Sequence, residues 1–168
     1  MKNNEISNEL KKIFKKAESS LEYQNILKTG VAVIPDGEKT IPESAFSACE
    51  NLIDIILPES LEIIGEKAFW YCQNLKRIDF KNKVLQIDRG AFWGCSKLEK
   101  INLPNSLKTI DDEVFRECKN LTYILISDNV ERIGDYAFWG CDNLVIHAPA
   151  GSYAEQYAKE NNIPFVAE

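Results

Sequence analysis

The sequence lacks the excess of basic residues that nucleic-acid-binding proteins carry. Its 20 Lys and Arg stand against 26 Asp and Glu, which makes the formal net charge -6. Nucleic acids and anionic membrane surfaces both attract clustered Lys and Arg. We therefore expect neither a nucleic-acid partner nor binding to an anionic membrane surface.

Long apolar runs are also missing. The first ten residues, MKNNEISNEL, contain no apolar stretch, so the sequence as it stands has no secretory signal. No segment approaches the ~18 apolar residues of a membrane span, and we expect no membrane insertion. The default expectation is a cytoplasmic protein, whereas removal of a leader would place the protein outside the cell or at the cell surface.

Features of catalytic and metal sites are equally scarce. His147 is the only histidine, and no nucleophile with an orienting carboxylate is set up beside it. No Gly-rich phosphate loop occurs, and the cysteines lie too far apart for the close C-x-x-C pairs of zinc sites. We predict no catalytic, cofactor-binding or metal-binding residues, and we expect a protein that is not an enzyme.

What the sequence does contain is a repeat of 23 residues. The repeating columns are Phe46, Phe69, Phe92, Phe115 and Phe138; Cys49, Cys72, Cys95, Cys118 and Cys141; Leu52, Leu75, Leu98, Leu121 and Leu144; Ile41, Ile64, Ile87, Ile110 and Ile133; and Ile55, Ile78, Ile101 and Ile124. The last column breaks at His147, which we expect to replace an inward isoleucine and to be satisfied near the C-terminal cap. Several columns in one register identify a tandem array.

Each unit is expected to contain one helical turn and one short strand. In A-F-x-x-C three apolar side chains fall on one side of a helical turn, and L-x-x-I-x-L alternates like a strand. Residues suited to helix ends flank the turns: Asp88, Asp111, Gly65 and Gly134 before them, and Asn51, Asn74, Asn120 and Asn143 after them. Because one unit cannot bury its own apolar face, the coils must stack.

Capping helices are predicted at both ends of the array. Residues 1–30 show apolar positions at helical spacing, residues 31–150 hold five repeats, and residues 151–168 form a second helix and a tail. Ser152 and Glu155 suit a capping box, and Phe165 and Val166 would cover the last coil. The predicted fold is an α/β repeat solenoid in one structural domain. It is a right-handed leucine-rich-repeat coil with short parallel strands on one face and helical turns on the other.

Two stretches carry a resemblance to a known family. IGDYAF at 133–138 followed by CDNL at 141–144, and the C-terminal APAGSYAEQYAKENNIPF at 148–165, resemble the BspA-like leucine-rich repeats, also called the treponemal type or type 5. The resemblance covers about residues 31–166. It implies a non-enzymatic binding module, common in bacteria, whose members are often surface proteins implicated in adhesion to host proteins.

The cysteine column has two interpretations. It is either a ladder of small buried hydrophobic residues or a redox or metal site. The odd number leaves one thiol unpaired in any disulfide scheme, and we expect the buried ladder, which fits a reducing compartment.

The residue after each repeat phenylalanine is expected to face outward. These positions form a predicted outer stripe of Trp70, Trp93, Arg116 and Trp139. Aligned indoles and a guanidinium can stack into a rib that shields the neighbouring turns. The alternative is an interface, including a possible homodimer, since exposed aromatic residues and Arg anchor protein contacts.

The strands present a second candidate surface, on the face predicted to be concave. Its outward residues are Asp54, Ile56, Arg77, Asp79, Lys100, Asn102, Tyr123 and Leu125. A solvated sheet face is one interpretation, and a face that binds a protein or peptide is the other. We expect a protein-protein interaction module; the alternative is a structural or adhesin fragment of a bacterial surface protein with no independent partner.

Overall fold

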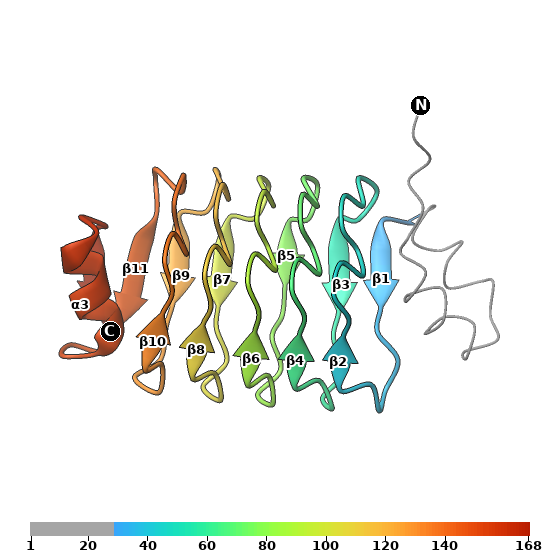
Figure 1. The fold of residues 1–168 in the computed structure, drawn as a ribbon, viewed down its shortest axis with the longest axis horizontal. Helices are drawn as coiled ribbons and strands as arrows, with labels where there is room; N and C mark the ends of the chain where they lie inside the picture. The colour runs from blue at the N-terminus through green and yellow to red at the C-terminus, as the bar shows by residue number, and fades with distance from the viewer. Residues whose placement is uncertain (1–28) are drawn as a thin grey trace.

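The computed structural model describes residues 29–168 as a stack of flat coils (Figure 1). Each coil contributes one strand to each of two walls. The strands are β1 Val31–Val33, β2 Thr40–Ile41, β3 Asp54–Ile56, β4 Ile63–Ile64, β5 Arg77–Ile78, β6 Gln86–Ile87, β7 Lys100–Asn102, β8 Thr109–Ile110, β9 Tyr123–Leu125, β10 Arg132–Ile133, β11 Val145–Ala148 and β12 Phe165–Ala167. The one helix of this part of the chain, α3 (Tyr153–Glu160), packs on the last coil.

Strands pair in parallel with their equivalents in the next coil, except that β5 and β7 are not joined. The odd-strand wall consists of a β1-β3-β5 sheet and a β7-β9-β11-β12 sheet, and the even-strand wall is one sheet from β2 to β10. Asp54 pairs with Arg77 and Ile87 with Ile110, so the strand register equals the sequence repeat. The parallel solenoid predicted from the repeat is confirmed.

The sequence prediction missed the even-strand wall. It expected one strand in each unit, whereas a second segment of each unit, such as Ile63–Ile64, forms another parallel ladder of two-residue strands. Each strand places one residue outward and one isoleucine inward, as Thr109 and Ile110 do. Strands this short escape a periodicity argument, which needs at least four alternating residues.

The phenylalanine column forms the centre of the core. Successive rings from Phe46 to Phe138 are stacked nearly parallel, with centroids 5.1 to 5.7 Å apart. The isoleucine and leucine columns surround them and are buried throughout residues 29–168. Stacked rings at this spacing mean that each coil's core side chains are in contact with those of the next coil.

The segments predicted as helical turns are successive β-turns. The N–H of Phe46 donates to Ala68 of the next coil at 2.7 Å, whereas the N–H of Ser47 donates within its own coil to Ser44. The same alternation recurs in the following coils, while an α-helix would keep all these bonds within one coil. We call this stack of turns (42–51, 65–74, 88–97, 111–120 and 134–143) the turn rib.

Left-handed backbone makes these turns possible. Two positions per coil have φ between 53° and 79°: Ser44, Lys67, Gly90, Glu113 and Tyr136, and four residues later Ala48, Tyr71, Gly94, Glu117 and Gly140. The predicted helix-end residues, such as Asp88 and Asn74, therefore have no helix to cap. Glycine is the usual residue in this backbone conformation, but it occupies only three of these ten positions. The other seven residues gave no sign of a turn, so sequence reasoning did not predict one.

Substitution of Gly94 tests this backbone assignment. Gly94→Ala is expected to lower the free energy of unfolding by about 1–2 kcal/mol, since φ is +76° and the added Cβ would lie 3.0 Å from the ring of Tyr71. Gly37→Ala is the matched control, since it has a left-handed φ and open space around it. Urea unfolding of both variants should show the larger loss for Gly94→Ala; equal losses would contradict the close contact.

The C-terminal helix begins as the capping box predicts. Ser152 is the N-cap, its hydroxyl accepts from the Glu155 N–H, and the Glu155 carboxylate accepts from the Gly151 N–H. In the tail, Phe165 packs against the core as predicted, whereas Val166 is exposed. Both residues belong to a strand that was not predicted, β12, which extends the odd-strand wall beside β11. The helix predicted within residues 1–30 falls almost wholly outside the described residues.

His147 does not occupy the inward isoleucine column. The last coil is one residue shorter at this point, so Ile146 pairs with Ile124 and fills that column, while His147 pairs with Leu125. A slip of one residue in a strand exchanges its two faces. His147 therefore points outward, where its Nδ1 lies 2.6 Å from the Glu168 carboxylate.

Candidate binding surfaces

The odd-strand wall brings all eight predicted face residues onto one side of the coils. Residues 54, 77, 100 and 123 form one row and residues 56, 79, 102 and 125 the next, because the coils are in register. Ile56 is 54% exposed and the Arg77 side chain 80% exposed, whereas Asp54, Tyr123 and Leu125 are half-buried. The two rows together therefore form a mixed surface, which is apolar at its ends and charged in the middle.

The charges of this face are only partly paired. Arg77 Nη2 lies 2.6 Å from the Asp54 carboxylate, and Lys81 Nζ lies 2.8 Å from Asp79. The Asp79 carboxylate, by this hydrogen bond, raises the pKa of Lys81. Lys100 is exposed and has no ion-pair partner among residues 29–168, so it is available to an acidic group of a ligand.

A break in the wall lies at the second coil. No ladder joins β5 to β7, so the odd-strand wall is two sheets. At this point Phe80 replaces the smaller Leu57 and Leu103 of the neighbouring coils, and its ring packs edge-on against Phe92 at 5.9 Å. The break therefore lies in the coil that holds this larger ring, between two coils that have leucine at the same position.

An aromatic cluster closes the face at its C-terminal end. The rings of Tyr123 and His147 are 4.2 Å apart, and His147 is held by Glu168. Sequence reasoning missed His147 as a face residue because it assumed an unbroken 23-residue step. The signal available was the run Val145-Ile146-His147, in which a shift of one residue restores the isoleucine column.

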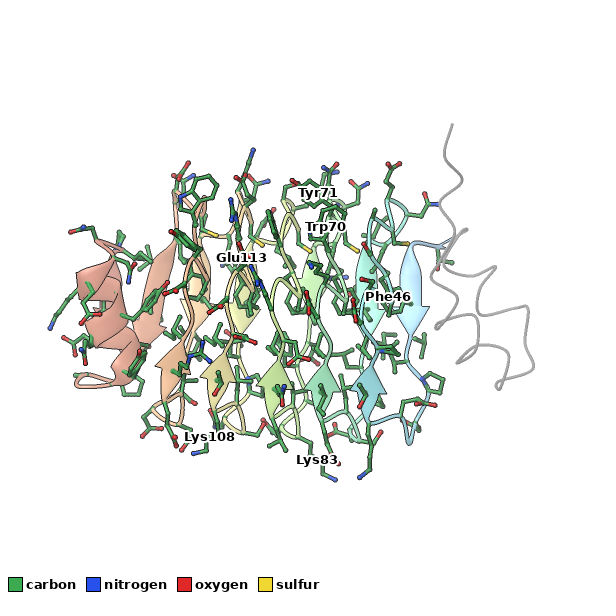
Figure 2. All side chains as sticks on the ribbon, viewed as in Figure 1. Phe46, Trp70, Tyr71, Lys83, Lys108 and Glu113 are labelled. Carbon is green, nitrogen blue, oxygen red and sulfur yellow. The ribbon has the colours of Figure 1, made fainter. Side chains whose placement is uncertain are left out.

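The outer stripe lies along the turn rib, with Trp70 and Tyr71 at the edge shown in Figure 2. Arg116 lies between two indoles, 4.5 Å from the Trp93 ring centroid and 4.7 Å from that of Trp139. Trp70 meets Trp93 edge-to-face at 6.5 Å. The four predicted stripe residues are thus in contact from coil to coil.

Glu113 is a buried partner of the outer stripe that sequence reasoning missed. It is the one buried charged residue of the described chain, and its carboxylate lies 2.8 Å from Arg116 and 3.0 Å from Arg89. Hydrogen bonding to Glu113 raises the pKa of Arg89. Glu113 therefore fixes the guanidinium that the indoles enclose; the i, i+3 spacing to Arg116 was the only sequence signal.

The cysteine column is a ladder of free thiols. The Sγ atoms of Cys72, Cys95, Cys118 and Cys141 each donate to a phenylalanine carbonyl of the preceding coil at 2.9 to 3.1 Å. Burial raises the pKa of these thiols, to about 12 for Cys141. Thiols held protonated are poor nucleophiles and poor metal ligands. Within residues 29–168 no three His, Cys, Asp or Glu side chains gather as a metal site would require.

A hollow of about 700 Å³ lies between the last coil and α3. Its lining includes the last turn of the rib, the start and end of α3, and the acids Asp135, Asp142 and Glu160. Burial, and then the charge of Asp135, raises the pKa of Tyr157 to about 12. No sequence column pointed to this hollow, because only the last coil, with no coil after it, can form it.

Comparisons with known proteins agree with the coil architecture. A leucine-rich repeat protein of T. pallidum is 32% identical, with a TM-score of 0.67 over 70% of this chain and 57% of its own. A leucine-rich cell surface protein of Faecalibacterium prausnitzii is 25% identical, with a TM-score of 0.59 over 70% of this chain and 38% of its own. The chain thus spans little more than half of the first protein. No curated protein matches the sequence significantly.

The fold and the repeat also agree with a family assignment. Within the described part of the chain, no helix is of the length and apolarity needed to cross a bilayer. The BspA type leucine rich repeat region matches residues 19–145 in six copies, one more than the sequence columns show, and begins inside the segment expected to be a helix. Because the family model matches most of the chain and the described residues form a stack of parallel coils, the protein belongs to the BspA-type leucine-rich repeat family.

Proposed function

We propose that the protein is a non-enzymatic interaction module that binds a protein or peptide through its odd-strand wall. The observation that supports this most is that Ile56, Arg77 and Lys100 are exposed on one face, in strands that belong to two parallel sheets. Members of the family generally mediate protein interactions or adhesion. A rigid wall loses little conformational entropy when it binds.

The composition of this face suits a protein ligand. Its apolar ends, Ile56 and the Tyr123–Leu125 pair, supply area that gains from burial, and Arg and Tyr are common where binding energy concentrates. The basic pair Arg77 and Lys100 supplies charge recognition, which governs specificity and association rate more than affinity. We expect the partner to present acidic groups flanked by apolar ones.

The outer stripe is a weaker candidate for an interface. Arg116 is already enclosed by Trp93 and Trp139 and neutralised by Glu113. A charge that is paired within the chain has less to gain from a second copy, which favours the shielding role, whereas the buried Arg116 Nε and Trp93 Nε1 have no hydrogen-bond partner among the described residues. Trp139, 51% exposed, is where a homodimer contact would form.

Cellular location remains a proposal as well. The free thiols of residues 29–168 are those of a protein folded in a reducing compartment, where the cytoplasmic expectation would place it. The F. prausnitzii protein is described as a cell surface protein. Because four of the five thiols are buried, they would also persist outside the cell, and we propose a surface location by analogy with that relative.

The triple variant Arg77→Ala/Lys100→Ala/Tyr123→Ala tests the proposed face. Recovery of bound protein from a lysate is expected to fall at least about tenfold, since each truncation at a binding centre costs about 1 kcal/mol or more. The control variant Lys39→Ala/Lys83→Ala/Leu85→Ala removes two basic side chains and one large exposed side chain that lie away from the face and from the hollow between the last coil and α3. Equal recovery by the test variant and the unaltered protein would refute binding through this wall.

A further inference from the structure

The turn rib ends in hydrogen-bond donors that no further coil accepts. The N–H groups of Phe46, Phe69, Phe92 and Phe115 each donate to the next coil at 2.7 to 2.9 Å. In the last coil the equivalent donors are the N–H groups of Tyr136, Phe138 and Gly140, and no acceptor for them is present among residues 29–168. Three donors at a two-residue spacing form a template for another stretch of backbone.

These donors belong to residues that line the hollow between the last coil and α3. Figure 1 shows α3 beside β11 at this end of the stack. The hollow of about 700 Å³ has room for a short peptide segment, and Tyr136 and Phe138 contribute to its wall. Packing of α3 closes it on one side, with the Tyr157 ring 6.0 Å from that of Phe138. A ligand would therefore enter along the turn edge of the last coil.

The charge of the hollow is uniformly acidic. Asp135, Asp142 and Glu160 line it, and no Lys or Arg does. None of these three carboxylates has an ion-pair partner among the described residues, although Glu160 accepts a hydrogen bond from Gln156. Unpaired carboxylates repel an anionic ligand and attract a cationic one.

Exposed aromatic rings add a second attraction for cations. Tyr136 is 62% exposed and Trp139 51% exposed, both at the hollow. The Trp139 indole already accepts one guanidinium, that of Arg116 at 4.7 Å. Rings of this kind bind Lys and Arg side chains through the negative face of the π system.

We infer that the hollow between the last coil and α3 binds an extended, Lys- or Arg-rich segment of a partner protein. Carbonyl oxygens of that segment accept from Tyr136, Phe138 and Gly140, and its cationic side chains meet Asp135, Asp142 and Glu160. This site is separate from the odd-strand wall, where the proposed ligand is acidic and meets Arg77 and Lys100. Evidence against binding at one of the two sites would therefore leave the proposal for the other unchanged.

Amide NMR spectra of the whole chain, titrated with blocked pentapeptides, test this site. The peptide GKAKG is expected to shift the amide signals of Tyr136, Phe138 and Gly140 and the indole signal of Trp139, whereas GEAEG should shift none of them. The variant Asp135→Asn/Asp142→Asn/Glu160→Gln should bind GKAKG about tenfold more weakly, because the two lysines of the peptide lose ion pairs of up to ~1 kcal/mol each.

The control removes the same charge elsewhere. Asp36→Asn/Glu59→Gln/Asp128→Asn neutralises three exposed acids that do not line the hollow, and it should bind GKAKG as the unaltered chain does. Equal weakening in both variants would overturn the inference, since net charge alone would then account for binding. The inference would also be overturned if GEAEG shifted the signals of the hollow. It would be overturned as well if those signals shifted with protein concentration in the absence of peptide, because a second copy of the chain would then be the ligand.

Discussion

Replacing Phe92 by alanine is expected to lower the free energy of unfolding by about 3–5 kcal/mol. The ring is fully buried, stacked between Phe69 at 5.1 Å and Phe115 at 5.5 Å, with Phe80 edge-on at 5.9 Å. Rigid coils on both sides cannot collapse into the space left behind, so both transfer and cavity costs apply. Urea unfolding followed by circular dichroism measures the loss.

Leu85→Ala is the matched control for this loss. Leu85 is 51% exposed in the neighbouring coil, and its removal should change stability by less than about 0.5 kcal/mol. Should Phe92→Ala fail to fold, Phe92→Leu keeps the column filled and should retain the fold with a smaller loss. Equal unfolding midpoints for Phe92→Ala and Leu85→Ala would show that the phenylalanine column does not hold the coils together.

Raising the pH above 9 is expected to destabilise the fold steeply. Burial raises the pKa of Cys72, Cys95, Cys118 and Cys141 above the usual 9.0. Above pH 9 the unfolded chain releases these protons while the folded chain keeps them, so stability present below pH 9 is lost as pH rises toward the folded pKa. Each thiol contributes about 1.4 kcal/mol per pH unit, and four contribute about 5–6.

The variant Cys95→Ala isolates one of these thiols. Tyrosines and lysines also titrate above pH 9, but equally in both proteins, so they cancel in the comparison. Unfolding free energies measured in urea between pH 8 and pH 10.5 should fall less steeply for Cys95→Ala, by about 1.4 kcal/mol per pH unit above pH 9. Parallel curves would mean that Cys95 ionises in the folded protein and is not sealed in the core.

The sequence alone predicted which side chains are buried. The Phe, Ile, Leu and Cys columns return every 23 residues, and a constant step can bury one residue type repeatedly only if the coils are in register. The start of the C-terminal helix was predicted from local signals, because Ser152 and Glu155 form hydrogen bonds within their own turn. Such features depend on neighbours in the chain or on strict periodicity.

Backbone conformation was less predictable. An A-F-x-x-C pattern places the same three side chains inward on a helical turn or on successive β-turns, and only the bonds from one coil to the next distinguish them. Side chains such as Lys67 and Tyr71 in left-handed backbone do not reveal a turn. Cross-coil hydrogen bonds stabilise that conformation against its local cost, which no local propensity includes.

By itself, the sequence determined the period, the core and the outward position of the stripe residues, since all three follow from repetition. Tertiary structure decided the rest: the second wall, the outward turn of His147 after one missing residue, and the acidic hollow at the end of the rib. The physical reason is that these features arise where one coil meets another, or where stacking stops. A repeated motif describes the inside of a coil, whereas its ends and contacts depend on what lies beside it.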